Sequence, residues 1–265
     1  AKQRDFLALY SRRLNTVEGN TTFYATPNVE TIERWRAETP TGFRFCFKFP
    51  QAITHRKRLR EVGAETEEFL DRLERLGDRA GPSFLQLPPT FGASNLPSLI
   101  SYLDSLPRDF RYAVEVRHPS FFRAPAEAAL EEALRERGVT RVLFDVRGLR
   151  SAGPDEAATR AAQRRKPDVP VRYSRTAPFA FVRFIAHPEV EANAALLDEW
   201  AGRVAAWLAA GDDVFFFTHS PNDALSPVLA RDLHARIARI AALHPVPPLP
   251  PWEEAAQEPK QANLF

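Results

Sequence analysis

The sequence is poor in residues on which several kinds of scaffold and site depend. Cys46 is the one cysteine among 265 residues, which excludes an internal disulfide framework and a structural zinc site of the multi-cysteine kind. No apolar run approaches the roughly 18 residues that a membrane span needs, and the first residues do not resemble a signal peptide. Methionine is absent altogether. We therefore expect a globular protein of the cytoplasm with no membrane partner.

Several common catalytic motifs are also missing. The sequence has no glycine-rich phosphate loop, no Gly-x-Ser-x-Gly elbow and no His-Glu-x-x-His helix, which argues against the nucleotide-binding, serine hydrolase and zinc protease classes that use them. The net charge of +2 is too small to indicate a nucleic-acid binder by itself. Basic residues do gather in two segments, residues 56–60 and 147–175, and each segment follows a predicted strand.

The apolar pattern alternates between two periods. Helical spacing is found in residues 6–14, 69–76, 196–208 and 229–240. Between them lie short runs of aromatic and β-branched residues, at 16–19, 43–49, 83–87, 112–116, 141–146, 179–185 and 214–218. Strands that alternate with helices predict an α/β fold, a TIM-type (β/α) barrel that lacks its first strand in this chain. We expect the barrel domain to cover residues 1–244 and a proline-rich tail to cover residues 245–265.

The strand at residues 43–49 has a strict period of two. Phe43, Phe45 and Phe47 should face the helices, while Arg44, Cys46 and Lys48 should face the interior of the barrel. The other predicted strands also end in polar side chains, and the carboxyl ends of barrel strands share one mouth. We expect one pocket there, with Glu18, Glu115, Asp145 and His219 as catalytic candidates and Asn20, Tyr24, Lys48, His55, Gln86, Arg117, His118 and Arg183 as substrate-binding candidates.

This set of side chains suits a phosphate or carboxylate substrate, since fixed cations bind such groups. In this interpretation Lys48, Arg117 and Arg183 hold phosphate, Glu18 and Glu115 act as acid and base, and Asp145 with His219 orients a water or holds a metal. A divalent metal stays open and is not favoured, because the spacing of the acids and histidines defines no ligand set. The competing interpretation is structural. In it, buried ion pairs such as Glu115 with Arg117 or Asp145 with Arg183 only support the packing of the interior.

Several segments resemble the YecE-like family, which is defined by a domain of unknown function. The segments are Val17-Glu18-Gly19-Asn20-Thr21-Thr22-Phe23-Tyr24, Arg44-Phe45-Cys46-Phe47-Lys48-Phe49-Pro50 with Thr54-His55, Leu85-Gln86-Leu87-Pro88, Glu115-Val116-Arg117-His118-Pro119 and the final Leu264-Phe265. The resemblance spans essentially the whole chain and implies a TIM barrel, similar to those of divergent sugar isomerases and abasic-site endonucleases. Family members begin with a strand and a tryptophan-bearing loop that this sequence lacks.

Three functions remain open at this stage. The first is a hydrolase, of the phosphodiesterase or endonuclease type, that acts on a phosphorylated or nucleic-acid substrate. The second is a sugar-directed, isomerase-like enzyme whose aromatic residues stack on a sugar. The third is a non-catalytic adaptor for nucleic acid or protein. Gln261, Leu264 and Phe265 resemble the peptide by which bacterial repair proteins dock on the sliding clamp, which would favour a role linked to DNA.

Overall fold

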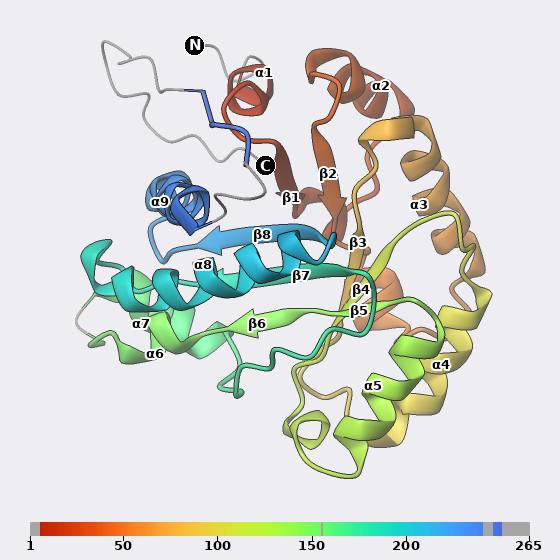
Figure 1. The fold of residues 1–265 in the computed structure, drawn as a ribbon. Coiled ribbons are helices and arrows are strands. Elements are labelled where there is room, and N and C mark those ends of the chain that lie inside the picture. The colour runs from red at the N-terminus through yellow and green to blue at the C-terminus, as the bar shows by residue number, and fades with distance from the viewer. Residues whose placement is uncertain (1–5, 155, 241–245, 251–265) are drawn as a thin grey trace. The chain divides into compact units, whose positions relative to one another are not determined.

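The computed structural model describes residues 6–154, 156–240 and 246–250 (Figure 1). These residues form two compact units. Unit 1 takes the described residues of 1–88, 95–113 and 249–265, and unit 2 takes residues 89–94 and 114–248. Within the described part of the chain, no helix is both long and apolar enough to cross a membrane.

Unit 1 alternates strands and helices along the chain. Its elements are α1 (Phe6–Ser11), β1 (Thr16–Gly19), α2 (Val29–Glu38), β2 (Arg44–Phe47), α3 (Gly63–Leu76), β3 (Ser83–Gln86), α4 (Leu96–Ser105) and the first half of β4 (Tyr112–Glu115). Asn28 starts α2 by accepting a hydrogen bond from the Thr31 backbone N–H on its side-chain oxygen, which satisfies one of the free donors of the first turn.

Unit 2 continues the alternation. It holds the end of β4 and then α5 (Ala126–Glu136), β5 (Thr140–Arg141), β6 (Leu143–Asp145), α6 (Arg147–Ser151), α7 (Ala157–Arg165), β7 (Phe179–Ile185), α8 (Ala194–Ala209), β8 (Asp213–His219) and α9 (Ser226–Ile240). Every strand predicted from the sequence is present. The predicted strand at 141–146 is divided at Val142, whose N–H donates to the Val114 carbonyl oxygen.

The predicted TIM-type barrel is wrong. The described strands fall into three small sheets, ordered β1–β2, β3–β4–β5 and β6–β7–β8, and not into one closed ring. Between β2 and β3 the pairing is reduced to two isolated parallel bridges, Phe45 with Ala80 and Lys48 with Phe84. The alternation of strands with helices indicates parallel strands, but it does not specify whether the backbone ladders between neighbouring strands are continuous.

The predicted register of β2 is confirmed. Phe45 stacks on Trp35 of α2 at a centroid distance of 6.0 Å, and the Phe47 ring lies 5.8 Å from the same indole. Phe43 meets Tyr10 of α1 edge to face at 6.3 Å. The phenylalanines therefore face helices. Lys48 lies on the other face of the strand, as its polar contacts below show.

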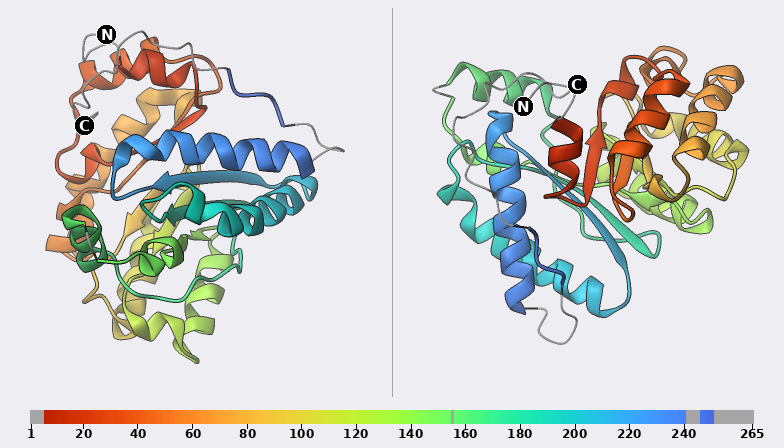
Figure 2. Two further views of the ribbon diagram at one scale, coloured as in Figure 1. Left: turned by 90° about the vertical axis from the view of Figure 1, so that its left-hand side faces the viewer. Right: turned by 90° about the horizontal axis from the view of Figure 1, so that it is seen from above.

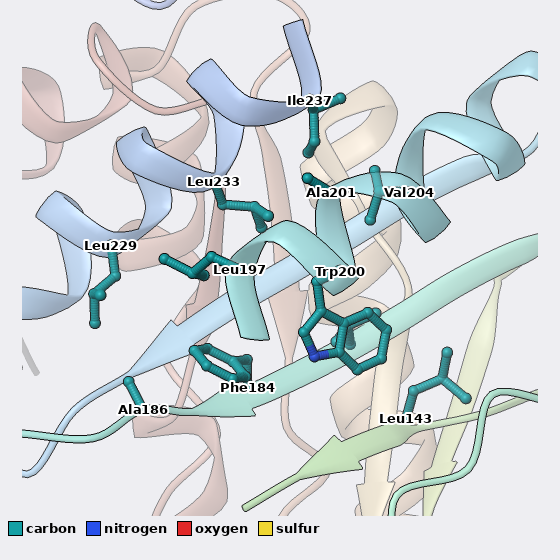
Figure 3. Packing of buried hydrophobic residues seen from close by; sticks show 11 residues of the cluster. Leu143, Phe184, Ala186, Leu197, Trp200, Ala201, Val204, Leu229, Leu233 and Ile237 are labelled. Carbon is teal, nitrogen blue, oxygen red and sulfur yellow. The ribbon is translucent and has the colours of Figure 1, made fainter. Parts of the chain in front are cut away.

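The largest described core of unit 2 lies between the sheet and two helices. Figures 1 and 2 show α8 and α9 side by side against β7 and β8. Trp200 of α8 is fully buried there (Figure 3). Its ring lies 5.5 Å from Phe216 of β8. The other buried members are Leu143, Val182, Phe184, Ala186, Leu197, Ala201, Val204, Leu229, Leu233 and Ile237. Alternate residues of β7 thus face the helices, and this leaves Phe181 and Arg183 on the opposite face.

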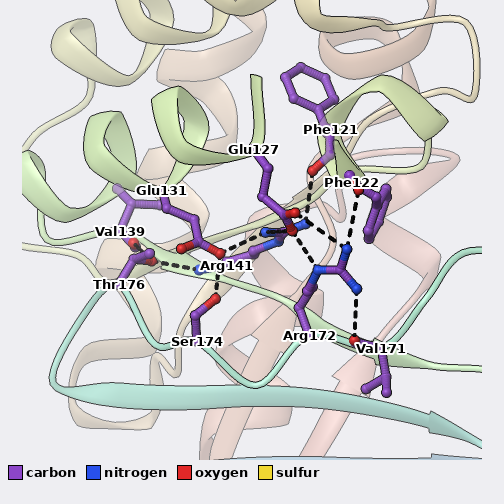
Figure 4. Close-up of polar contacts among 10 residues, drawn as sticks. All are labelled: Phe121, Phe122, Glu127, Glu131, Val139, Arg141, Val171, Arg172, Ser174 and Thr176. Carbon is purple, nitrogen blue, oxygen red and sulfur yellow. Dashed lines mark hydrogen bonds and ion pairs between the residues drawn. The ribbon is translucent and has the colours of Figure 1, made fainter. Parts of the chain in front are cut away.

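A buried polar cluster in unit 2 holds the segment after β4 in place. Arg141 is 1% exposed and ion-paired with Glu127 and Glu131 of α5, at 3.0 and 2.8 Å (Figure 4). Its Nη2 also donates to the Phe121 carbonyl oxygen at 3.1 Å. Arg172 pairs with the same Glu127 and donates to the Phe122 carbonyl oxygen. These contacts fix the 3-10 turn Pro119–Phe122, which comes directly after the candidate residues Arg117 and His118.

Candidate functional site

The polar centre of unit 2 is the carboxylate of Glu115, the last residue of β4. Its side chain is fully buried. Arg183 of β7, 3% exposed, donates from Nη1 to Glu115 Oε2 at 2.5 Å. Arg117, 10% exposed, places Nε 3.3 Å from Oε1. Two strands that are far apart in the sequence thus bring two guanidinium groups to one buried carboxylate.

The charges of this group influence one another strongly. Burial by itself would raise the pKa of Glu115, but the positive charges of Arg183 and Arg117 outweigh it, so the pKa lies below its ordinary value. Burial and the charge of Arg183 lower the pKa of Arg117, against the attraction of Glu115. Glu115 is therefore ionised at neutral pH and suits the orientation of cations better than the donation of a proton.

Arg117 has one buried donor that is not satisfied. Its Nε has no aligned hydrogen-bond acceptor, although it lies within ion-pair distance of Glu115. Its Nη2 donates to the Arg165 carbonyl oxygen at the end of α7, at 3.3 Å. A buried donor without an acceptor is unfavourable, and such groups mark places where a ligand or a water completes the bonding.

His118 is held in one orientation by the turn that follows it. The Ser120 backbone N–H donates to His118 Nδ1 at 3.1 Å, and the Ser120 hydroxyl lies 2.8 Å from the same nitrogen. The Ala93 N–H in turn donates to the Ser120 hydroxyl. Because Nδ1 accepts a hydrogen bond, the neutral ring carries its proton on Nε2. Gly92 packs on this ring, and a Cβ there would lie 3.1 Å from Cε1.

His219 and Arg183 occupy the same face of the sheet formed by β6, β7 and β8. β7 and β8 are parallel, with Arg183 opposite Phe217 and Ile185 opposite His219. Side chains two residues apart point the same way, so His219 shares the face of Phe217 and of its partner Arg183. The Phe181 and Phe217 rings on this face lie 5.0 Å apart.

Asp145 lies on the opposite face of its strand from this group. It is fully buried, and the Trp200 indole N–H donates to Oδ2 at 2.8 Å. Arg147 donates to the same carboxylate from Nη2 at 2.8 Å and from its backbone N–H at 2.9 Å. Arg183 instead lies over the ring of Phe144, the neighbouring residue of β6. The structure thus places Asp145 in the helix layer, apart from Glu115 and Arg183, and its catalytic role stays a prediction.

Unit 1 holds a second group of candidates at the ends of β1 and β2. Asn20 donates from Nδ2 to Glu18 Oε1 at 2.9 Å, and Glu18 is buried. Thr22 donates to the Lys48 carbonyl oxygen at 2.6 Å and so ties the turn after β1 to the end of β2. This bond explains why the Glu18 and Lys48 segments are held together.

Lys48 is 8% exposed and is surrounded by polar and aromatic groups of unit 1. Its Nζ donates to Gln86 Oε1 at 2.8 Å and lies 3.7 Å from the centroid of the Phe23 ring. The Phe23 ring contacts His55 at 5.0 Å and Tyr24 at 5.2 Å, both edge to face. Tyr24 is 75% exposed, which leaves an aromatic surface open to solvent.

Sequence reasoning missed the side chains that support these candidates. Ser120 orients His118, Trp200 and Arg147 engage Asp145, and Thr22 joins two strand ends. Ser120 lies two residues from His118 and follows a proline, and proline together with serine is typical of a turn, so a local signal was present. Trp200 could not, because it lies 55 residues beyond its partner on a different element.

No group of three or more His, Cys, Asp or Glu side chains in the described ranges is arranged to hold a metal ion. Gln261, Leu264 and Phe265, which resemble a clamp-docking peptide, lie outside the described residues.

Comparison with known proteins gives consistent matches over nearly the full length. The family model "Protein of unknown function DUF72" matches residues 1–254. The UPF0759 protein YecE of Escherichia coli K12 is 43% identical over 243 residues, which cover 90% of this chain and 89% of that protein. The YecE protein of Escherichia coli O157:H7 is 42% identical over the same length.

Solved structures show the same fold at low identity. A DUF72 family protein from Enterococcus faecalis V583 superposes with a TM-score of 0.66 and 16% identity, covering 95% of this chain and 96% of that chain. A DUF72 family protein from Thermotoga maritima MSB8 gives a TM-score of 0.63 and 22% identity, covering 88% and 91%. At these identities the likeness is evidence for the fold alone.

Proposed function

Because the chain belongs to the DUF72 family, as the resemblance of its motifs predicted, and this family has no described function, we propose an activity from the side chains themselves: hydrolysis of a phosphorylated or nucleic-acid substrate. The observation that carries the proposal is the pair of buried guanidiniums of Arg117 and Arg183 at the one carboxylate of Glu115. Guanidinium groups bind phosphate oxygens through paired, charge-assisted hydrogen bonds.

The geometry supports a binding role for both arginines. Glu115 is ionised and holds them in place, so they need no reorganisation when an anion arrives. The unsatisfied Nε–H of Arg117 supplies a donor for a phosphate oxygen. A phosphate in contact with both groups would offset the repulsion between two buried cations.

In this proposal one histidine accepts a proton and the other donates a hydrogen bond. Water attacks phosphorus while His219, on the face of Arg183, accepts its proton. The P–O bond to the leaving group breaks as the departing oxygen takes a proton from water, while the neutral His118 ring donates a hydrogen bond from its Nε2–H to a phosphate oxygen. The products are the free alcohol and phosphate, and His219 releases its proton to solvent. The hydrogen bond from the Ser120 N–H keeps His118 in the tautomer that this step requires.

The test is p-nitrophenol release from p-nitrophenyl phosphate and bis-p-nitrophenyl phosphate and cleavage of DNA with an abasic or nicked site, each with and without Mg²⁺, Mn²⁺ or Zn²⁺. We expect turnover of at least one substrate and a loss of about 100-fold or more in Arg183→Met, the magnitude typical of removing one transition-state donor. Arg135→Met is the matched control, because Arg135 lies 51% exposed on α5. No turnover of any substrate, or equal rates in the two variants, contradicts the proposal.

A sugar-directed activity is the second candidate, and the exposed ring of Tyr24 favours it. Tyr24 lies beside Phe23 in unit 1, where an aromatic face could stack on a sugar. Salt separates the two candidates, because binding of a phosphate-bearing ligand weakens steeply as salt is added and binding of a neutral sugar barely responds.

A further inference from the structure

The arginine pair of unit 2 has a cationic neighbour in the basic segment 147–175. Lys166 follows α7 directly, and its N–H donates to the Ala162 carbonyl oxygen at 2.9 Å. Its side chain is partly buried. Its positive charge lowers the pKa of Glu115, in addition to the larger effects of Arg183 and Arg117.

The end of α7 is fixed at this place by guanidinium groups. Arg117 Nη2 donates to the Arg165 carbonyl oxygen at 3.3 Å, and Arg150 Nη2 of α6 donates to the Lys166 carbonyl oxygen at 2.6 Å. Cations at the carboxyl end of a helix satisfy its free carbonyls and interact well with its dipole. The residue that would bind phosphate, Arg117, therefore also positions the backbone beside Lys166.

An apolar cluster supports the same arrangement. Ala162 of α7 and Leu149 of α6 pack with Phe144 of β6 and Ile185 of β7, all buried. Gln163 of α7 bonds the Leu149 and Ala152 carbonyl oxygens through Nε2, both at 3.0 Å. These contacts hold α6 and α7 together as one layer. Because Lys166 follows α7 directly, its backbone position is fixed by the same layer.

We propose that Lys166 is a third phosphate-binding cation, and that the site selects a terminal phosphate group in its doubly charged form over an internal phosphodiester. This inference rests on the proposed function of the same site. Lys166, Arg117 and Arg183 with Glu115 form a group whose own net charge is +2. A terminal phosphate carries close to two negative charges above its second pKa, near 6, whereas an internal diester carries one. Matched charge gives the largest stabilisation where the surroundings exclude water.

The same chemistry occurs in two kinds of molecule, a small phosphomonoester and the phosphorylated end of a nucleic acid. Both present a terminal phosphate to the three cations. Methyl phosphate represents the first, and a trinucleotide with a 5′-phosphate represents the second. Methyl sulfate has the same shape as methyl phosphate but a single charge, so it isolates the effect of charge.

Calorimetric titration of the full chain at pH 8 tests the inference. We expect methyl phosphate to bind at least tenfold more tightly than methyl sulfate or dimethyl phosphate. Lys166→Gln should reduce this preference to threefold or less. Arg164→Gln is the matched control: it removes the same charge from an exposed position in the last turn of α7 and should keep the preference. Thermal unfolding of both variants checks that they are folded.

The outcomes separate the two proposals. If the parent protein binds none of these anions, the proposed function fails. If it binds methyl phosphate and methyl sulfate equally, or if Lys166→Gln keeps the full preference, the proposed function stands and the role of Lys166 is refuted. The trinucleotide identifies the source of the phosphate. If it binds more tightly than methyl phosphate, and if removal of its 5′-phosphate abolishes this gain, the ligand is the end of a nucleic acid. If the trinucleotide and methyl phosphate bind equally well, the ligand is a small phosphomonoester.

Discussion

Arg183 of β7 and Glu115 of β4 form a hydrogen-bonded ion pair of 2.5 Å between residues 68 positions apart in the chain. Both side chains are almost completely removed from solvent. Their pairing fixes the end of β4, the strand that leads into Arg117 and His118. The stability of unit 2 and the geometry of the candidate site therefore depend on the same contact.

Glu115→Gln should lower the free energy of unfolding by about 3 kcal/mol, the usual penalty for leaving buried charges without their partner. Two guanidiniums lose their counterion, so added phosphate should restore part of the loss by occupying the same place. Urea unfolding with and without 20–50 mM phosphate, a range on the order of that used for weak anion sites, measures both effects. Glu132→Gln on the exposed face of α5 is the control. Equal stabilities of the two variants would show that the pair contributes little.

The contribution of Glu115 should depend on pH in one direction. Its pKa in the folded protein lies below the ordinary value of 4.5, so its stabilising effect is complete above that value. The effect is lost as the pH falls through the folded-state pKa, because the native state must then take up a proton that it binds weakly. The difference in unfolding free energy between the parent protein and Glu115→Gln should be constant from pH 6 to 8 and shrink below about pH 4.5. A difference that grows as the pH falls would contradict this sign.

Arg141→Met should destabilise unit 2 by about 3 kcal/mol, because it leaves the carboxylates of Glu127 and Glu131 without a buried partner. The turn at Phe121 would also lose a backbone contact. Urea denaturation measures the loss, and Arg135→Met on the exposed side of α5 should change stability little. The double variant Arg141→Met/Glu131→Gln should be less destabilised than the sum of its single changes, since the two residues interact directly.

Two glycines in helices should respond to alanine in opposite ways. A Cβ at Gly148 of α6 would lie 2.7 Å from the His187 backbone nitrogen, so Gly148→Ala should cost about 2 kcal/mol by forcing α6 away from the end of β7. A Cβ at Gly202 of α8 would have no other atom within 4 Å, so Gly202→Ala should stabilise by up to about 1 kcal/mol through helix propensity. Thermal melts of the two variants give the comparison, and a shift of the same sign in both would overturn it.

The clamp-docking peptide is a prediction from the sequence alone. A fluorescent peptide of residues 259–265 should bind a bacterial sliding clamp with a dissociation constant of tens of micromolar or tighter, on the order of other short apolar anchors behind a flexible spacer. Changing Leu264 and Phe265 to alanine should abolish binding, because the two side chains are the expected anchors. A peptide with the same composition in scrambled order is the control. Absence of binding would remove the link to DNA that the motif suggests.

Several features of this protein followed from the sequence because they depend on local periodicity. The period of two in β2 placed Phe43, Phe45 and Phe47 against helices, and the rings of Tyr10 and Trp35 are where they pack. The helical spacing of Leu229 and Leu233 predicted a helix, and the structure has α9 at these residues. The spacing of two between Glu115 and Arg117 placed both side chains on one side of the chain, and there they form an ion pair. These properties are set by neighbours within a few residues, and a single sequence contains that information.

Other features were decided by the tertiary structure. The strands alternate with helices as a barrel would require, yet the ladder from β2 to β3 is reduced to isolated bridges, because backbone hydrogen bonds between strands do not depend on side-chain type. Asp145 was predicted to join Arg183, but it accepts hydrogen bonds from Trp200 and Arg147 in the helix layer. Trp200 lies 55 residues away on α8, and only the packing of that helix brings its N–H to the carboxylate. Contacts between distant elements decide which buried charges meet, and periodicity carries no information about them.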